Sequence, residues 1–139
     1  MRKRRMLMVL LVGSGLIGSA WAIDNKGITF EQPAADCFTL IEDGKATPIL
    51  LDEKDDVGII IAVKNLQDDF RKVTGRQAEL LHSVRGSRLI VAGSLESRFI
   101  KELVKAKKID ITSLKGKREK YLMKAVSRPF DGVDEAWVV

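Results

Sequence analysis

The side chains best suited to catalysis or metal binding are scarce in this sequence. It contains one histidine, His82, and one cysteine, Cys37. A zinc site built on histidine needs further nitrogen or sulfur ligands, and a lone cysteine cannot form an internal disulfide. We therefore interpret His82 as an outward-facing strand residue and Cys37 as part of the hydrophobic packing. A free reactive thiol at Cys37 is the alternative.

Serine chemistry has candidates but no supporting pattern. A Ser-His-Asp arrangement would have to combine His82 with one of four serines, Ser83, Ser87, Ser94 or Ser97. None of them occurs in the Gly-x-Ser-x-Gly motif that presents a nucleophile on a sharp strand-to-helix turn. The sequence therefore predicts no catalytic residue, no metal ligand and no bound cofactor.

Four acidic residues lie close together and could supply paired carboxylates: Asp52, Glu53, Asp55 and Asp56. Such a cluster could perform acid–base chemistry or hold calcium weakly. The simpler interpretation is a solvated connector that leads into a helix. The aspartate at position 55 or 56 would then accept hydrogen bonds from the free N–H groups of the first helical turn.

Two other stretches could bind an anion. The Gly93-Ser94 turn could do so at the start of the following helix, although one glycine is far from a phosphate-loop motif and an ordinary tight turn is the simpler interpretation. A second stretch is rich in basic residues and could contact an acidic polysaccharide or phosphate; otherwise it is a solvated face. Its seven basic residues are Lys105, Lys107, Lys108, Lys115, Lys117, Arg118 and Lys120.

A central β-strand is the element around which these candidates must be arranged. Arg88–Ala92 contains a continuous apolar run with β-branched residues, and Gly93-Ser94 ends it, so we expect a strand in the middle of a sheet. The Asp43-Gly44 pair between two apolar runs predicts a hairpin. The other predicted strands are residues 38–41, 48–51, 78–82, 121–126 and 136–139.

Two amphipathic helices are predicted beside these strands. In residues 57–74 an apolar stripe recurs every three or four positions, and Gly75 supplies the left-handed residue that ends a helix. The second helix covers about residues 96–107. The stripes consist of Ile59, Val63, Leu66, Phe70 and Val73 in the first helix, and of Phe99, Ile100, Leu103 and Val104 in the second. The element order predicts an α/β (α+β) fold, a mixed sheet packed by two main helices.

The N-terminal 22 residues have the pattern of a secretory signal peptide. Arg2-Lys3-Arg4-Arg5 precedes an apolar run from Met6 to Ile17, and Ala20-Trp21-Ala22 fits the cleavage pattern. We therefore predict export to the periplasm or medium, with no membrane attachment after cleavage. The remaining chain has a net charge of +1 rather than the +5 of the whole, which argues against a nucleic-acid partner.

Several short motifs together resemble one enzyme family. They are Phe38-Thr39-Leu40-Ile41, Asp43-Gly44-Lys45-Ala46, Pro48-Ile49, Phe70-Arg71-Lys72-Val73-Thr74-Gly75-Arg76, Ile90-Val91-Ala92-Gly93-Ser94, Lys108-Ile109-Asp110-Ile111, Leu114-Lys115-Gly116-Lys117-Arg118-Glu119, Pro129 and Gly132-Val133-Asp134. In order and spacing these motifs are similar to the N-terminal region of glycoside hydrolase family 115, the xylan α-1,2-glucuronidases, over about residues 37–139.

The resemblance implies a non-catalytic accessory domain, similar to the α/β domain that precedes the barrel in hexosaminidases and α-glucuronidases. The parent enzyme would remove (4-O-methyl)glucuronic acid from xylan in carbohydrate metabolism. Its catalytic carboxylates would lie in a (β/α)8 barrel that this chain lacks, so the barrel is the implied partner and glucuronoxylan is bound through it. We therefore expect a signal peptide (1–22), an irregular lead-in (23–36) and an accessory domain (37–139) that is inactive alone.

The last predicted strand, residues 136–139, stops within an apolar run, so we expect a fragment of a longer polypeptide. Such a strand should leave an open sheet edge with unpaired backbone groups and an exposed apolar patch. The alternative is a free-standing secreted module that binds a polysaccharide or a protein. Trp137 and Tyr121 are its only candidates for an aromatic platform, and we expect both to be buried against missing structure or left bare.

Overall fold

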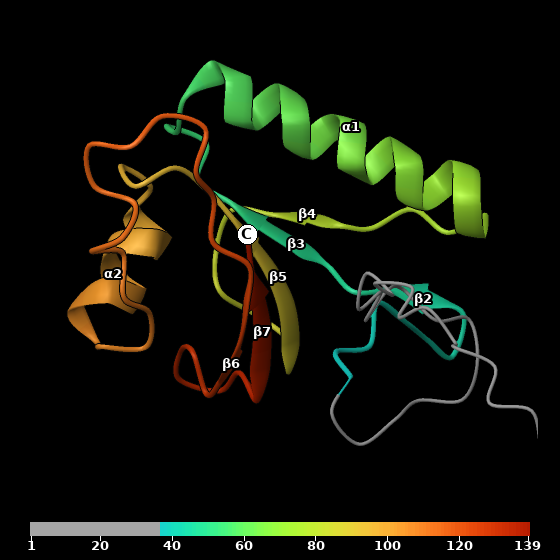
Figure 1. Ribbon diagram of the computed structural model, residues 1–139. Coiled ribbons are helices and arrows are strands. Elements are labelled where there is room, and N and C mark those ends of the chain that lie inside the picture. Colours follow the sequence, from blue (N-terminus) through green and yellow to red (C-terminus); the bar gives the residue numbers. More distant parts are fainter. Residues whose placement is uncertain (1–36) are drawn as a thin grey trace, which may run out of the picture. The chain divides into compact units, whose positions relative to one another are not determined.

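The strand predicted at Arg88–Ala92 is the third of five strands in the main sheet, as expected from its apolar run. The structure is a computed structural model, which describes residues 37–139 (Figure 1). Leu89, Ile90 and Val91 are each at most 2% exposed, so both faces of this strand are covered. The predicted signal peptide and the lead-in over 23–36 lie outside the described residues.

The main sheet has the strand order β4-β3-β5-β7-β6. These strands are β3 (Ile49–Leu51), β4 (Leu80–Leu81), β5 (Arg88–Ala92), β6 (Lys124–Ser127) and β7 (Glu135–Val138). Four of them run parallel to one another, and β6, at one edge, runs antiparallel to β7. The predicted α/β fold with a mixed sheet is therefore confirmed.

The hairpin predicted around Asp43-Gly44 is present, but its strands are shorter than expected. β1 (Ile41–Glu42) pairs with β2 (Lys45–Ala46), and Asp43 and Gly44 have φ values of 48° and 72°. Positive φ at both turn residues is what a two-residue type I′ hairpin requires. We predicted that the apolar run at 48–51 would be the second strand of this hairpin, and this is wrong. The run forms β3 instead, because burial on both faces is available only inside the main sheet.

Helix α1 (Val57–Thr74) has the predicted bounds and covers one face of the sheet (Figure 1). The last residue of the predicted apolar stripe, Val73, is wrong, because its side chain is 69% exposed. The buried side continues instead from Phe70 to half-buried Thr74, four residues on, whose hydroxyl donates to the Phe70 carbonyl at 2.6 Å. Buried residues packed together on this face of the sheet include Val63, Phe70, Ile49, Leu51 and Ile90.

Helix α2 (Arg98–Lys105) covers the opposite face and is shorter than the predicted helix over 96–107. Its buried residues Phe99, Ile100 and Leu103 belong to the larger hydrophobic core. Alternate residues of one strand serve the two cores, since Leu50 faces α2 whereas its neighbours in β3 face α1. Loop residues complete the covering of the α2 face, among them Ile109, Phe130 and Val133.

The expectation of an open edge at residues 136–139 is wrong. Strand β7 lies inside the sheet and pairs with β5 on one side and β6 on the other. Ala136 and Val138 are buried, and the Val139 N–H donates to the Val91 carbonyl at 2.9 Å. The physical reason is that the chain first forms β6 at the edge and then turns back, so that β7 runs antiparallel to β6 and is inserted between β6 and β5.

Candidate functional site at the carboxyl end of the sheet

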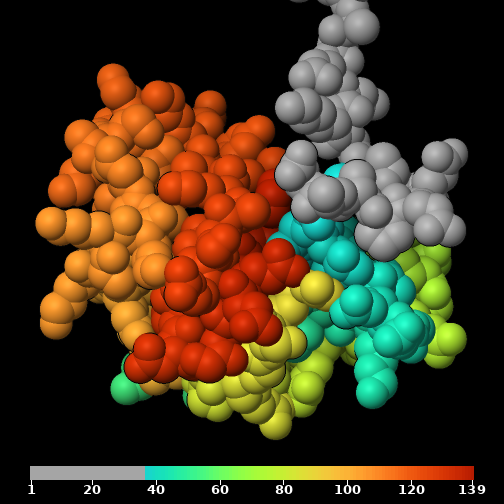
Figure 2. All heavy atoms as spheres, turned by 90° about the horizontal axis from the view of Figure 1, so that it is seen from below, coloured from blue at the N-terminus to red at the C-terminus, as the bar shows by residue number. Residues whose placement is uncertain are grey.

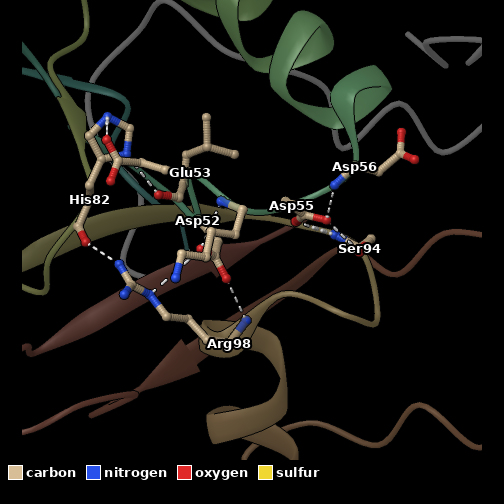
Figure 3. Close-up of polar contacts among 9 residues, drawn as sticks. Asp52, Glu53, Asp55, Asp56, His82, Ser94 and Arg98 are labelled. Atoms are coloured by element: carbon tan, nitrogen blue, oxygen red, sulfur yellow. Dashed lines mark hydrogen bonds and ion pairs between the residues drawn. The ribbon is translucent and has the colours of Figure 1, made fainter.

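Two loops meet at the carboxyl end of the sheet, where the chain leaves neighbouring strands for opposite faces. Residues 52–56 lead from β3 to α1, and residues 93–97 lead from β5 to α2. In open α/β sheets this switch point is where ligands most often bind. The acidic cluster and the Gly93-Ser94 turn, which the sequence offers as separate candidates, therefore lie side by side (Figure 3).

Asp52 is the most buried charged group of this site, at 6% exposure. Its carboxylate accepts hydrogen bonds from two backbone N–H groups, that of Arg98 at 2.9 Å and that of Lys54 at 3.1 Å. The Arg98 N–H is one of the free donors at the start of α2. The bond from Arg98 lowers the pKa of Asp52 below its ordinary value, against the opposing effect of burial.

Asp55 binds the second loop in the same way. Its carboxylate accepts a hydrogen bond from the Ser94 N–H at 2.9 Å and another from the Ser94 hydroxyl. The loops approach so closely that a Cβ on Gly93 would lie 3.1 Å from Oδ2 of Asp55 and 2.8 Å from Cβ of Ser97. The Gly93-Ser94 turn therefore does hold an anion, and the anion is a carboxylate of this chain.

The remaining aspartate of the cluster acts as the predicted helix cap. Asp56 is the N-cap residue of α1, and its Oδ1 accepts the Gly58 N–H at 2.7 Å. The N-cap residue of α2, Ser97, is 1% exposed, and its hydroxyl has no hydrogen-bond partner among residues 37–139. Ser97 thus fills space beside Gly93 rather than capping its helix.

Arg98 and His82 complete the contacts around the site (Figure 3). The guanidinium of Arg98 donates to the carbonyl of His82, and its Nε lies 3.8 Å from Oδ1 of Asp52. Nδ1 of His82 lies 3.0 Å from the Leu51 carbonyl, and Nε2 lies 3.8 Å from Glu53, which is largely exposed. His82 is exposed, as predicted, but it lies just beyond the end of β4.

The geometry does not assemble the catalytic sets considered above. The hydroxyl of Ser94 donates to Asp55 and accepts the Glu96 N–H, whereas the ring nitrogens of His82 lie near Leu51 and Glu53. Among residues 37–139, no three His, Cys, Asp or Glu side chains come together as a metal site would need. What the arrangement does chemically is pair two carboxylates with N–H donors at the start of α2 and in the loop before it.

The basic stretch lies in α2 and the loop after it, and part of it adjoins this site, since Lys117 and Lys120 line the same hollow as Gly93 and Ser94. Of its seven cations, six are exposed and Lys108 is half-buried. Asp110 lies within the stretch and binds the hydroxyl and the N–H of Thr112 at 2.6 and 2.8 Å. The hydrogen bond from the Thr112 hydroxyl is the main reason that the pKa of Asp110 is lowered.

The remaining candidates have different surroundings. Cys37 is exposed, so its predicted role in packing is wrong. The physical reason is that the adjacent Phe38 points inward and packs on Trp137, with ring centroids 6.1 Å apart. Trp137 is accordingly half-buried within the described unit, whereas Tyr121 is 79% exposed.

Sequence reasoning missed Asp52 and Arg98 as a pair. Each lies at the boundary of a recognisable element, since Asp52 directly follows β3 and Arg98 begins α2. A signal was available in principle, because polar residues after parallel strands gather at one edge of a sheet. This signal would bring Asp52 and Arg98 together only if it were known that β3 and β5 are neighbours in the sheet, and the sequence does not show that.

Comparison with known proteins adds no relative: no protein-family model matches the chain, and no curated protein matches it. Within residues 37–139, no helix has the length and apolar character needed to cross a membrane.

Proposed function

We propose that this chain is the non-catalytic N-terminal accessory domain of an exported glycoside hydrolase of family 115. The parent enzyme would release (4-O-methyl)glucuronic acid from xylan, and the domain would support its catalytic (β/α)8 barrel. The proposal combines the motif resemblance over residues 37–139 with the α/β fold of the same residues.

One observation supports an architectural role above all: carboxylates of the chain itself occupy N–H donors at the switch point of the sheet. The Asp52 carboxylate accepts a hydrogen bond from the Arg98 N–H, and the Asp55 carboxylate accepts hydrogen bonds from the Ser94 N–H and hydroxyl. These are donors that a phosphate or carboxylate ligand would otherwise use at this position. A scaffold needs such contacts to fix two helices on opposite faces of one sheet, whereas a catalytic crevice needs open donors.

The decisive experiment is to read the genomic DNA downstream of the Val139 codon in all three frames. A continuation that encodes several hundred residues of a (β/α)8 barrel is expected. A stop codon followed by an unrelated gene would contradict the proposal.

An activity assay tests the same proposal from the opposite direction. The purified chain should release no glucuronic acid from glucuronoxylan, whereas a family 115 enzyme with its barrel, assayed in parallel, should release it. Release by this chain, persisting through repeated purification and absent from a mock preparation, would contradict a non-catalytic role.

The alternative of a free-standing binding module has one observation in its favour, the 79% exposure of Tyr121 beside the basic stretch. An accessory domain and a free-standing module can both bind a polysaccharide. The DNA sequence distinguishes them, because only the accessory domain requires the barrel.

A further inference from the structure

Charge is distributed unevenly over the described residues. The segment 105–124, here called the basic connector, contains eight Lys or Arg residues and only two acidic residues, Asp110 and Glu119. The other described residues contain more acidic than basic side chains. The positive charge of residues 37–139 is therefore concentrated in one segment, and Figure 2 shows the orange part of the chain, which includes most of it, gathered on one side of the unit.

The cations of the basic connector outnumber the carboxylates near them, where Asp110 attracts Lys115 and Lys124. None of the eight forms an ion pair with another residue in the range 37–139. Two of them contact backbone carbonyls instead: Lys120 Nζ lies 3.5 Å from the Ser113 oxygen and Lys124 Nζ lies 3.3 Å from the Lys108 oxygen. These contacts leave the charges free to pair with an external anion.

Two adjoining hollows run along this segment. The first, of about 350 Å³, has one carboxylate, Asp110, and four lysines in its lining: Lys107, Lys108, Lys115 and Lys124. The second, of about 500 Å³, is mostly apolar and has Lys117, Lys120 and Tyr121 in its lining. Ile109 and Ile111 line both hollows, so together they form one continuous surface.

Tyr121 gives this surface an exposed aromatic ring next to lysine ammonium groups. Its side chain is 79% exposed, and its neighbours Leu122 and Lys120 line the same hollow. A flat apolar ring beside point charges is suited to a ligand with apolar C–H faces and regularly spaced anionic groups. Sugar rings that bear carboxylates have both features.

We propose that the basic connector binds a linear polysaccharide that bears carboxylate groups. The lysines pair with the carboxylates, and Tyr121 and the apolar lining of the second hollow contact the faces of the sugar rings. This inference goes beyond the architectural role proposed above and does not depend on it, because binding requires neither a barrel nor hydrolysis.

A polysaccharide fits this surface better than a nucleic acid. The connector has seven lysines and one arginine, which can pair with carboxylate as well as with phosphate, so its charges alone do not favour a nucleic acid. It has one exposed aromatic residue, whereas binding of single strands usually relies on several stacking platforms. The N-terminal export pattern also predicts a compartment in which acidic polysaccharides are available.

The test compares ligands that differ only in charge. Binding of the purified chain is measured by isothermal titration calorimetry with polygalacturonate and with the same polymer after full methyl esterification, which removes the carboxylate charge. A single-stranded oligothymidylate with an equal number of charges is the third probe. The polyuronate should bind at low salt, its ester should bind at least about tenfold more weakly, and the oligonucleotide should bind more weakly than the polyuronate.

Matched variants locate the surface. The triple variant Lys115→Gln, Lys117→Gln, Lys120→Gln should lose about tenfold or more in affinity for the polyuronate. The slope of log K against log salt concentration should also become shallower by roughly 0.7 per lost contact, the value for flexible single strands. The control triple Lys45→Gln, Lys64→Gln, Lys72→Gln removes the same charge from exposed positions elsewhere and should lose less than about threefold.

A ring-specific substitution separates the sugar contact from charge alone. Tyr121→Ala should weaken polyuronate binding several-fold without changing the salt dependence, whereas Tyr121→Phe should bind nearly as the wild type. Circular dichroism of every variant should match the wild type, because these side chains are exposed. No binding of polygalacturonate, equal losses in the two triple variants, or tighter binding of the oligonucleotide would each overturn the proposal.

Discussion

Removing the Asp52 carboxylate should weaken the whole domain. The substitution Asp52→Ala deletes the acceptor for the N–H groups of Arg98 and Lys54. Lys54 is exposed, so water can replace the carboxylate there. The Arg98 N–H is at the start of α2, and its part-buried bond to Asp52 joins residues 46 positions apart in the sequence.

The size of the effect follows from these contacts. A hydrogen bond to a charged group contributes about 1.5–3 kcal/mol, and a carboxylate near a helix N-terminus adds about 0.3–1 kcal/mol. Counting the Arg98 bond fully and the Lys54 bond as nearly replaced by water, the loss is about 2–4 kcal/mol. In a domain of about 100 residues this corresponds to a fall in Tm of roughly 10–25 °C.

Urea unfolding measures this loss directly. Trp137 is the only tryptophan after the predicted signal peptide, and its fluorescence reports on β7 in the middle of the sheet. The matched control is Glu53→Ala, which removes a neighbouring carboxylate that is 67% exposed and lies 3.8 Å from His82. The control should change the free energy of unfolding by less than about 0.5 kcal/mol.

If Asp52→Ala and Glu53→Ala lower the free energy of unfolding by the same small amount, the reasoning is refuted. The carboxylate would then be a solvated group, and closure of the switch point by the chain itself would not hold the two loops together. The architectural role would lose its main support.

Three other predictions concern the same framework. Because the pKa of Asp52 is lowered in the folded protein, its stabilisation is complete above the ordinary carboxyl pKa of about 3.9 and is lost as the pH falls through the folded value. The gap in unfolding free energy between the wild type and Asp52→Asn should therefore be constant from about pH 5 to 7 and shrink below about pH 4; a gap that grows in acid would contradict this. Gly93→Ala should lower the free energy of unfolding in urea by about 1–3 kcal/mol, because the new Cβ would lie 2.8 Å from Cβ of Ser97. Ser97→Ala should leave this free energy unchanged or raise it slightly, since it removes a buried hydroxyl without a partner in the described part of the chain. Arg88 pairs with Glu135 and, at 2.7 Å, with Glu42, so Arg88→Met should cost about 1–2 kcal/mol and the cost should diminish in 1 M salt; a loss that does not change with salt would assign the effect to packing.

The elements themselves could be predicted from local patterns. The bounds of α1 and β5 were predicted correctly, because the three-to-four-residue apolar spacing and the β-branched run are properties of short stretches. The Asp43-Gly44 turn was also predicted, since positive φ at two successive positions strongly restricts the residue types. The strands that pair with the run at 48–51 were not predicted, because several predicted strands are equally apolar and could each have been its neighbour.

The position of the last strand shows why pairing needs the tertiary structure. A run such as 136–139 has the same local pattern at an edge and inside a sheet. Its place between β5 and β6 depends on the chain forming β6 at the edge first and then turning back, which buries Ala136 and Val138 inside the sheet.

The sequence by itself determined which residue types this protein has for chemistry: one histidine, one cysteine, an acidic cluster and a basic stretch. Only the tertiary structure decided that the acidic cluster meets the Gly93-Ser94 turn and the start of α2, 39 and 46 residues away. The physical reason is that a carboxylate and a free N–H each have the same local signal whether they bind a ligand or each other. Which of these happens depends on strand order, and strand order is a property of the whole core.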